Sequence, residues 1–441
     1  DEGAAELLRM QEGGCHPVDG CQDGDGFAGA DFDFLAANVE WEDTGETLFP
    51  AYAIRKFDGI KIGFIGMTLE GTPDIVSQSG IQGLDFLDEA ATANRYAEEL
   101  RREHGVRAIV VLLHEGGVQA SPFGIDDCNG ISGPIVDIVN RTTDAVDVFV
   151  AGHTHQPYRC VIDGRPVTSA SSFGRLVTDI DLTLDRRTKD VVSVATDNKV
   201  ITQNVARAAD ITALIAEYNT LAAPLRDRVI GRISADITRA TDDSGENAAG
   251  NLIADAQHAE STSAGAVAAF MNPGGVRADF LYAPSGSEAP GEVTYGEAFT
   301  VQPFGNSLVT MTLTGQQILD VLKQQWCAQT DRPRILLPSA SVGYTYDQSV
   351  AASIFNTPCD TAQNPVTGLT IGGTAVDPAA SYRITVNSFL ADGGDRFSVL
   401  RQGTHRVGGP VDTDALEAYI EPSLTGSPIA PPALDRIDVV P

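Results

Sequence analysis

The first half of the chain alternates short apolar runs with amphipathic segments, and this alternation limits the fold more than any other feature. The apolar runs are Phe32–Val39, Ile60–Met67, Ala108–Leu113 and Val146–Ala151, and the amphipathic segments are Asp88–Glu103 and Ile131–Asn140. Continuous apolar strands that alternate with helices are typical of a sheet that helices cover. We therefore predict a layered α/β domain.

A different pattern begins at Asp210. Apolar residues recur at helical spacing from Ile211 to Leu225, which predicts a connecting helix with Asp210 as its N-cap and its end near Pro224. Beyond this helix the mixed order of elements indicates an α+β domain. We expect helices at Ala248–Ser261 and Thr314–Gln324, strands at Ser307–Leu313, Leu369–Ile371 and Arg383–Val386, and an extended strap or the start of a linker at Ser427–Pro441.

These patterns divide the chain into three parts. We expect the first domain at 1–207, a linker helix at 208–229 and the second domain at 230–441.

The composition excludes several classes of protein. The 441 residues include 30 basic and 60 acidic ones, which gives a formal net charge of −30 at pH 7. This charge argues against a nucleic-acid polymer as partner and against docking on anionic lipid. The hydrophobic content of 42% is too high for a disordered acidic chain. The longest apolar runs fall far short of the ~20 residues that a membrane span needs.

The six cysteines predict disulfides. The chain has no Cys-x-x-Cys pair, which argues against a zinc ribbon or a thioredoxin-like motif. From proximity in the sequence we predict the pairs Cys15–Cys21, Cys128–Cys160 and Cys327–Cys359. The alternative is six buried free thiols, which a thiol titration under denaturing conditions would detect. Paired cysteines favour an oxidising compartment, so we expect a secreted, periplasmic or cell-surface protein.

Three of the seven histidines stand where an α/β sheet collects ligands. His114 ends one apolar run, and His153 and His155 follow another within Val-Phe-Val-Ala-Gly-His-Thr-His. Ligands bind just beyond the carboxyl ends of parallel strands. Two imidazoles two residues apart in an extended chain point the same way, so both can face one metal cluster. We expect the other histidines, His16, His104, His258 and His405, to be ordinary surface or core residues.

The Gly152-His153-Thr154-His155 stretch with His114-Glu115 resembles the calcineurin-like metallophosphatases. From Asp1 to about Arg436 the chain is similar to the bacterial secreted 5′-nucleotidase and UDP-sugar hydrolase family. In the second half this resemblance is carried by four motifs in order: Ala249-Gly250-Asn251-Leu252-Ile253-Ala254-Asp255-Ala256, Asn272-Pro273-Gly274-Gly275-Val276-Arg277, Pro303-Phe304-Gly305-Asn306 and Asn387-Ser388-Phe389-Leu390-Ala391-Asp392-Gly393-Gly394-Asp395.

The resemblance implies two divalent metal ions in the first domain, which clamp the phosphate and activate water. His114 and His153 would bind one ion and His155 the other; Mn, Zn, Co and Fe all suit imidazole ligands. The family's upstream Asp-x-His, Gly-Asp and Gly-Asn-His-Glu motifs do not occur here. Asp1 would match the residue that orients the catalytic histidine. We therefore expect a metallophosphatase domain whose first strands are missing. Such a segment, expressed alone, should bind metal weakly and hydrolyse little substrate. The alternative is a natural relative that binds no metal.

The resemblance assigns nucleotide binding to the second domain. The implied residues are Asn272 at the base edge, Gly274 and Gly275 where backbone approaches closely, Arg277 at the phosphate, Phe304 and Phe389 on either side of the base, and Asp395 at the ribose hydroxyls. The family's phosphate-binding arginine ahead of the Gly-Asn-Leu helix is missing, because that stretch reads Thr241-Asp242-Asp243-Ser244-Gly245-Glu246. Phosphate binding is then left to Arg277 and the metals.

The implied function is metal-dependent hydrolysis of nucleotide phosphoesters, which releases nucleoside and phosphate. A 2′,3′-cyclic-nucleotide phosphodiesterase or a nucleotide-sugar hydrolase on the same scaffold is an alternative, and so is a non-catalytic nucleotide-binding module. A Gly-x-Ser-x-Gly motif and a P-loop are both absent, which argues against a serine hydrolase and against ATP-driven work. The preferred base and the oligomeric state stay open.

Overall fold

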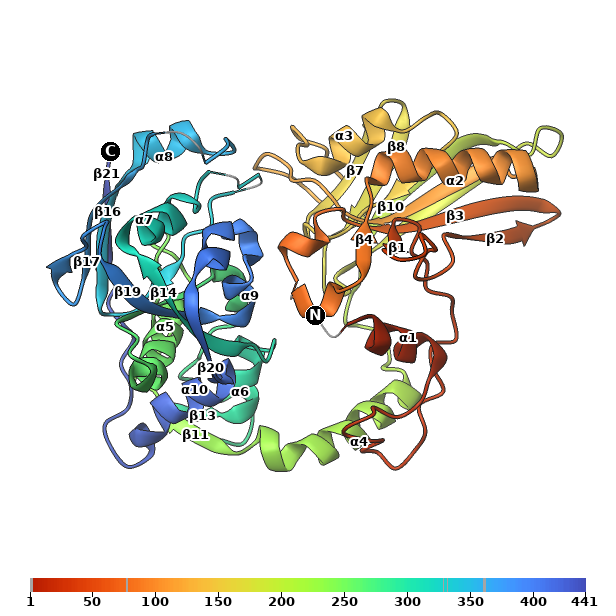
Figure 1. Ribbon diagram of the computed structural model, residues 1–441. Coiled ribbons are helices and arrows are strands. Elements are labelled where there is room, and N and C mark those ends of the chain that lie inside the picture. The colour runs from red at the N-terminus through yellow and green to blue at the C-terminus, as the bar shows by residue number, and fades with distance from the viewer. Residues whose placement is uncertain (1–2, 77, 328, 331, 360–361) are drawn as a thin grey trace. The chain divides into compact units, whose positions relative to one another are not determined.

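The computed structural model describes residues 3–76, 78–327, 329–330, 332–359 and 362–441 (Figure 1). The contacts between residues in space divide the chain into two compact units. One comprises Asp1–Pro73 and Gln78–Ala209, and the other comprises Asp74–Ser77 and Asp210–Pro441. Among the described residues, no helix has the length and the apolar content needed to cross a membrane.

A mixed sheet forms the centre of the first unit. Its strand order is β2-β3-β5-β6-β8-β7, with β3, β5, β6 and β8 parallel and the two edge strands antiparallel. Two antiparallel pairs, β1 with β4 and β9 with β10, complete the unit. The strands are β1 (Val39–Trp41), β2 (Tyr52–Phe57), β3 (Ile60–Thr68), β4 (Leu84–Phe86), β5 (Ala108–His114), β6 (Val148–Val150), β7 (Pro157–Ile162), β8 (Arg165–Ala170), β9 (Leu176–Leu184) and β10 (Val191–Val200).

Apolar side chains cover both faces of this sheet. On one face, Ala97 and Leu100 of α2 and Ile135 of α3 pack against strand residues such as Ile109. On the other face, residues of β9 and β10 pack against Val110 and its neighbours. Burial on both sides explains why β5 is apolar almost throughout, and it confirms the predicted layered α/β class. The helices of this unit are α1 (Ala4–Glu12), α2 (Glu89–His104) and α3 (Pro134–Arg141).

The predicted strand at Phe32–Val39 is wrong for most of its length, since only Val39 belongs to a strand, β1. The chain there meets its neighbours through single hydrogen bonds instead of a ladder. The Ala37 N–H donates to Gly66, and the Asn38 amide donates to the carbonyl oxygens of Thr68 and Leu87. Ala36, Ala37 and Val39 are buried although Phe32 is exposed, so hydrophobicity alone did not distinguish this loop from a strand.

Two sheets build the second unit, in the orders β15-β12-β19-β14-β20 and β18-β17-β16-β21, beside the pair β11-β13. Helix α5 packs on one face of the first sheet, while α7 and the second sheet cover the other. The strands are β11 (Val229–Arg232), β12 (Ala268–Met271), β13 (Glu292–Thr294), β14 (Ser307–Thr314), β15 (Leu337–Pro338), β16 (Val342–Asp347), β17 (Val366–Ile371), β18 (Thr374–Ala375), β19 (Ser381–Asn387), β20 (Thr404–Val411) and β21 (Ile437–Val440).

The helices of the second unit match the prediction where the sequence carries start signals. Asn247 caps α5 by accepting a hydrogen bond from the Gly250 N–H, and Thr314 forms a capping box with Gln317 at the start of α7. The helices are α4 (Ala209–Arg226), α5 (Ala248–Ser261), α6 (Tyr295–Val301), α7 (Gly315–Lys323), α8 (Gln348–Ile354), α9 (Ser388–Ala391) and α10 (Asp412–Ile420).

The connecting helix differs in detail from the prediction. Helix α4 contains Asp210 rather than being capped by it, and it continues past Pro224 to Arg226. Because the helix ends two residues later, the proline disturbs only its last turn. Of the two possibilities expected for the tail, the extended strap agrees with the structure, because β21 pairs in parallel with β16. The three predicted disulfides are confirmed: Cys15–Cys21, Cys128–Cys160 and Cys327–Cys359.

Candidate functional site

Three histidines lie at the carboxyl edge of the first unit's sheet. His114 is the last residue of β5, and the loop that follows β6 carries His153 and His155. Because β5 and β6 are parallel neighbours, their ends meet at one edge. The ring centroids of His114 and His153 are 5.4 Å apart, with the rings inclined at 68°. The structure therefore brings two of the three predicted ligands into ring contact, and His155 lies near enough to influence the titration of His114.

The loop that carries His153 and His155 is not extended, so the expectation of two side chains aligned along an extended chain is wrong. Both residues have left-handed backbone, with φ of 62° and 56°. The hydroxyl of Thr154 donates a 2.7 Å hydrogen bond to the Gly117 carbonyl oxygen. A Cβ at Gly116 would overlap the carbonyl oxygen of Gly152. These close contacts hold the loop in a conformation that residues with side chains rarely adopt.

The imidazole of His114 suits a divalent metal ion. Among the described residues, His114, His153 and His155 do not form a group whose ligand atoms all lie within 4.8 Å of one another. Partial desolvation of the ring, and then the nearby His155, lower the pKa of His114 below its ordinary value. The imidazole is therefore neutral at pH 7, which is the form that binds metals. The predicted catalytic residue Asp1 lies outside the described residues.

A second set of predicted residues comes together in the other unit. The Asn272 amide nitrogen donates a 2.8 Å hydrogen bond to Asp395 Oδ2, and its amide oxygen accepts one of 3.0 Å from Asn387. A Cβ at Gly274 would lie 3.5 Å from the same Asp395 oxygen. At Gly275, a Cβ would lie 2.9 Å from Asn272 Oδ1, so only glycine fits there. Asn272 is thus engaged with Asp395, a contact that the sequence did not indicate.

The predicted phosphate and base residues also lie close together. The guanidinium of Arg277 lies 5.6 Å from the ring centroid of Phe304 and donates a 3.2 Å hydrogen bond to the Gly274 carbonyl oxygen. Phe304 is 47% exposed. Its loop is tied to α9, the helix of Phe389, because the Ser388 hydroxyl donates to Asn306 Oδ1 at 3.3 Å. An exposed ring beside a guanidinium suits a flat, anionic ligand.

The family model for the 5′-nucleotidase C-terminal domain matches residues 229–402. The chain is 27% identical to a 5′-nucleotidase precursor from Thermus thermophilus. That solved structure superposes with a TM-score of 0.72, over 93% of this chain and 79% of the other. Residues 229–402 thus match the 5′-nucleotidase C-terminal domain, and the chain as a whole is similar to 5′-nucleotidases.

Two curated relatives are longer than this chain. The endonuclease YhcR of Bacillus subtilis is 30% identical over 427 residues, which are 96% of this chain and 32% of that protein. A cell wall protein of Listeria monocytogenes is 30% identical over 411 residues, which are 89% of this chain and 50% of that protein. The chain thus spans a third to a half of these relatives. The metallophosphatase-like fold of 5′-nucleotidases indicates divalent metal ions.

Several residues that contact the predicted site carried no local signal in the sequence. Gln329 and Arg334 both contact Asp395, although Gln329 is 66 positions away from it in the sequence. Neither belongs to a recognised motif. Asn387 and Asn306, in contrast, lie inside motifs that the sequence marked, and their hydrogen bonds give them roles in holding neighbouring site residues.

Proposed function

We propose that the protein containing this chain hydrolyses phosphoester bonds of nucleotides in a reaction that depends on divalent metal ions, and that it releases nucleoside and phosphate. The observation that carries the proposal is the ring contact of His114 with His153 at the sheet edge, with His155 in the same loop, in a chain similar to 5′-nucleotidases. We propose these histidines as ligands of two ions, with His155 on the second and Asp1 as the orienting carboxylate.

Bound metal would supply Lewis-acid polarisation of the phosphate and a water that is acidic at neutral pH. The chain's own residues would hold the substrate. Phe304 and Phe389 would stack on the base, Asp395 would accept hydrogen bonds from the ribose, and Arg277 would neutralise phosphate charge. The net charge of −30 makes a local concentration of positive charge necessary for an anionic substrate.

We propose that residues 1–207 form the metal-binding domain, that 208–229 form the linker helix and that 230–441 form the nucleotide-binding domain. We also propose that the protein acts outside the cytoplasm. All six cysteines are paired, which suits an oxidising compartment, and one relative is a cell wall protein. Fractionation of the source cells, with an antibody against the chain, tests the location; recovery in the cytosol alone would contradict it.

The activity test is phosphate release from AMP, UDP-glucose and 2′,3′-cyclic AMP by the protein expressed from its complete gene. Each substrate is assayed with Mn²⁺ and with EDTA. We expect EDTA-sensitive release, which His114→Ala and His153→Ala reduce by about 100-fold or more, while the control His104→Ala does not. The substrate that is hydrolysed fastest distinguishes the three enzymatic readings. Binding of adenosine without release of phosphate from any substrate would favour a non-catalytic module.

A further inference from the structure

We propose that Gln329 and Arg334 are positioning residues that hold the Asp395 carboxylate in place for the two hydroxyls of a ribose, and that the Cys327–Cys359 disulfide keeps them there. This inference rests on the proposed nucleotide binding of the second unit. It adds which residues set the selectivity for the two hydroxyls of a ribose.

The turn that presents Asp395 needs support from outside. Asp395 and Arg396 both have left-handed backbone, with φ of 53° and 64°, and Gly393 before them has φ of 88°. Left-handed backbone is disfavoured for residues with a side chain, and two such residues in succession are rare. The Asp395 side chain is also mostly enclosed, with 8% of the residue exposed. A buried carboxylate on a strained turn keeps one orientation only if its neighbours fix it.

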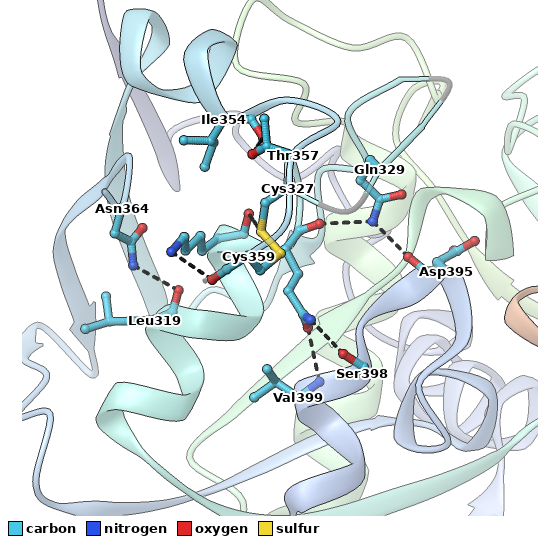
Figure 2. The surroundings of a disulfide bond; sticks show 12 residues. Leu319, Cys327, Gln329, Ile354, Thr357, Cys359, Asn364, Asp395, Ser398 and Val399 are labelled. Atoms are coloured by element: carbon cyan, nitrogen blue, oxygen red, sulfur yellow. Dashed lines mark hydrogen bonds between the residues drawn. A yellow bond between two sulfur atoms is a disulfide. The ribbon is translucent and has the colours of Figure 1, made fainter. Parts of the chain in front are cut away.

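Gln329 and Arg334 supply this support. The Gln329 amide nitrogen donates a 2.9 Å hydrogen bond to the backbone oxygen of Asp395 (Figure 2). The Arg334 Nε lies 3.4 Å from Asp395 Oδ1. Arg334 also donates a hydrogen bond to the Gln329 amide oxygen, so the two supporting residues fix each other.

The buried side chain of Gln329 links the Asp395 turn to the segment after α7 through hydrogen bonds. It is 0% exposed, and its amide nitrogen makes a second hydrogen bond, of 3.0 Å, to the Gln324 carbonyl oxygen. Its amide therefore uses both N–H groups and its oxygen within the protein. Replacement by an apolar residue would leave the Asp395 and Gln324 carbonyl oxygens without this donor in a dry environment.

The Cys327–Cys359 disulfide limits the conformational freedom of the backbone next to Gln329. Cys327 precedes Gln329 by two residues and follows the end of α7, and it is bonded to Cys359. Lys323 donates a 3.1 Å hydrogen bond to the Cys359 carbonyl oxygen, which joins the same two segments a second time. The Gln324 side chain donates to the Ser398 hydroxyl at 2.8 Å and accepts from the Val399 N–H at 3.1 Å. The residues after α7 are thus bonded to Asp395 itself and to the residues that follow its turn.

The chemistry that this arrangement favours is recognition of a vicinal diol. An ionised carboxylate can only accept hydrogen bonds, and a neighbouring guanidinium favours the ionised form. Asn272 donates to Oδ2 and Arg334 lies beside Oδ1, and the two oxygens of an ionised carboxylate offer about four acceptor positions. The 2′ and 3′ hydroxyls of a ribose are two hydrogen-bond donors, and a 2′,3′-dideoxyribose has neither. Loss of hydrogen bonds to a charged group costs about 10- to 150-fold in binding.

Calorimetric titration of the 441-residue chain with adenosine and with 2′,3′-dideoxyadenosine tests the inference. We expect the unaltered chain to prefer adenosine by about 100-fold. Gln329→Leu, Arg334→Gln and the double substitution Cys327→Ser with Cys359→Ser should each reduce this preference about tenfold or more, while dideoxyadenosine binds as before. A merely structural defect would weaken both ligands alike. Arg334→Lys, which keeps the charge without the fork, should retain part of the preference.

The matched controls are Gln316→Leu on exposed α7 surface, Arg228→Gln in another arginine–carboxylate pair of the same unit, and Cys128→Ser with Cys160→Ser in the other unit. These should leave the preference unchanged. An unchanged preference in all the test variants would overturn the inference.

Hydrogen exchange separates this inference from the proposed function. If the unaltered chain binds neither nucleoside, nucleotide binding by the second unit fails. The support of Asp395 is then tested by exchange in the peptide covering 390–400. Faster exchange in this peptide in Gln329→Leu, Arg334→Gln and the Cys327/Cys359 variant, with no change of rate in the control variants, would still show that these residues support the Asp395 turn. An unchanged exchange rate in the test variants would overturn the inference. The same measurement decides the case for any variant that loses nucleoside binding by misfolding.

Discussion

The acid Asp412 makes the stability of the second unit dependent on pH. Asp412 is the first residue of α10 and is 2% exposed. Burial raises its pKa from the ordinary 3.8 to about 7, against the opposing effect of hydrogen bonds from Thr413 and Asn306. Its Oδ1 has no hydrogen-bond partner among the described residues. The folded protein thus favours the protonated acid, whereas the unfolded chain ionises near pH 4.

The sign follows from proton binding. Between pH 4 and 7 the folded state holds a proton that the unfolded state has lost, so the free energy of unfolding falls as the pH rises. At about 1.4 kcal/mol for each pH unit, the interval from 3.8 to about 7 gives a loss of at most about 4 kcal/mol. Asp412→Asn, a neutral mimic of the protonated acid, should remove this loss. We expect it to stabilise the unit by about 1–4 kcal/mol at pH 8.5 and by little at pH 4.

Urea unfolding at both pH values measures this effect. Trp41 and Trp326 are the two tryptophans, so a Trp41→Phe background lets the fluorescence of Trp326 report on the second unit alone. Asp414→Asn, an exposed acid in the same helical turn, is the matched control and should change stability by less than about 0.5 kcal/mol. If Asp412→Asn leaves the stability at pH 8.5 unchanged or lower, the reasoning from burial is wrong.

Three further perturbations have expected outcomes. Phe304→Ala should weaken adenosine binding by about 5- to 100-fold in calorimetry, because base stacking contributes about 1–3 kcal/mol, and full affinity would exclude its stacking role. Gly394→Ala would place a Cβ 2.5 Å from the Phe389 ring, so it should lower adenosine affinity, and affinity equal to that of the unaltered chain would contradict the packing. Removal of the Cys128–Cys160 disulfide, with its separation of 32 residues, should lower the first unit's stability by about 2–4 kcal/mol in urea unfolding; no loss would argue against the entropic account.

The sequence predicted those elements whose signals are local. The apolar run at Ala108–Leu113 became β5 because a strand covered on both faces needs apolar residues throughout. Helix α5 was predicted with its bounds, and in the structure Asn247 caps it. The disulfides were found because each cysteine has a close partner along the chain.

The parts that escaped prediction depend on contacts between distant residues. The left-handed backbone of His153 and His155 follows from close packing against Gly116 and Gly117, which lie in the loop after another strand. Gln329 contacts Asp395 only because the tertiary fold brings these two distant parts of the sequence together. No periodicity or motif encodes such contacts, since they arise from tertiary packing.

Steady-state kinetics of AMP hydrolysis by the protein expressed from its complete gene, with Mn²⁺ present, tests the central claim most directly. The account predicts that His153→Ala lowers kcat by about 100-fold or more and leaves adenosine binding intact, whereas Asp395→Asn weakens adenosine binding about tenfold or more. Full turnover by His153→Ala, or unchanged adenosine binding by Asp395→Asn, would contradict it.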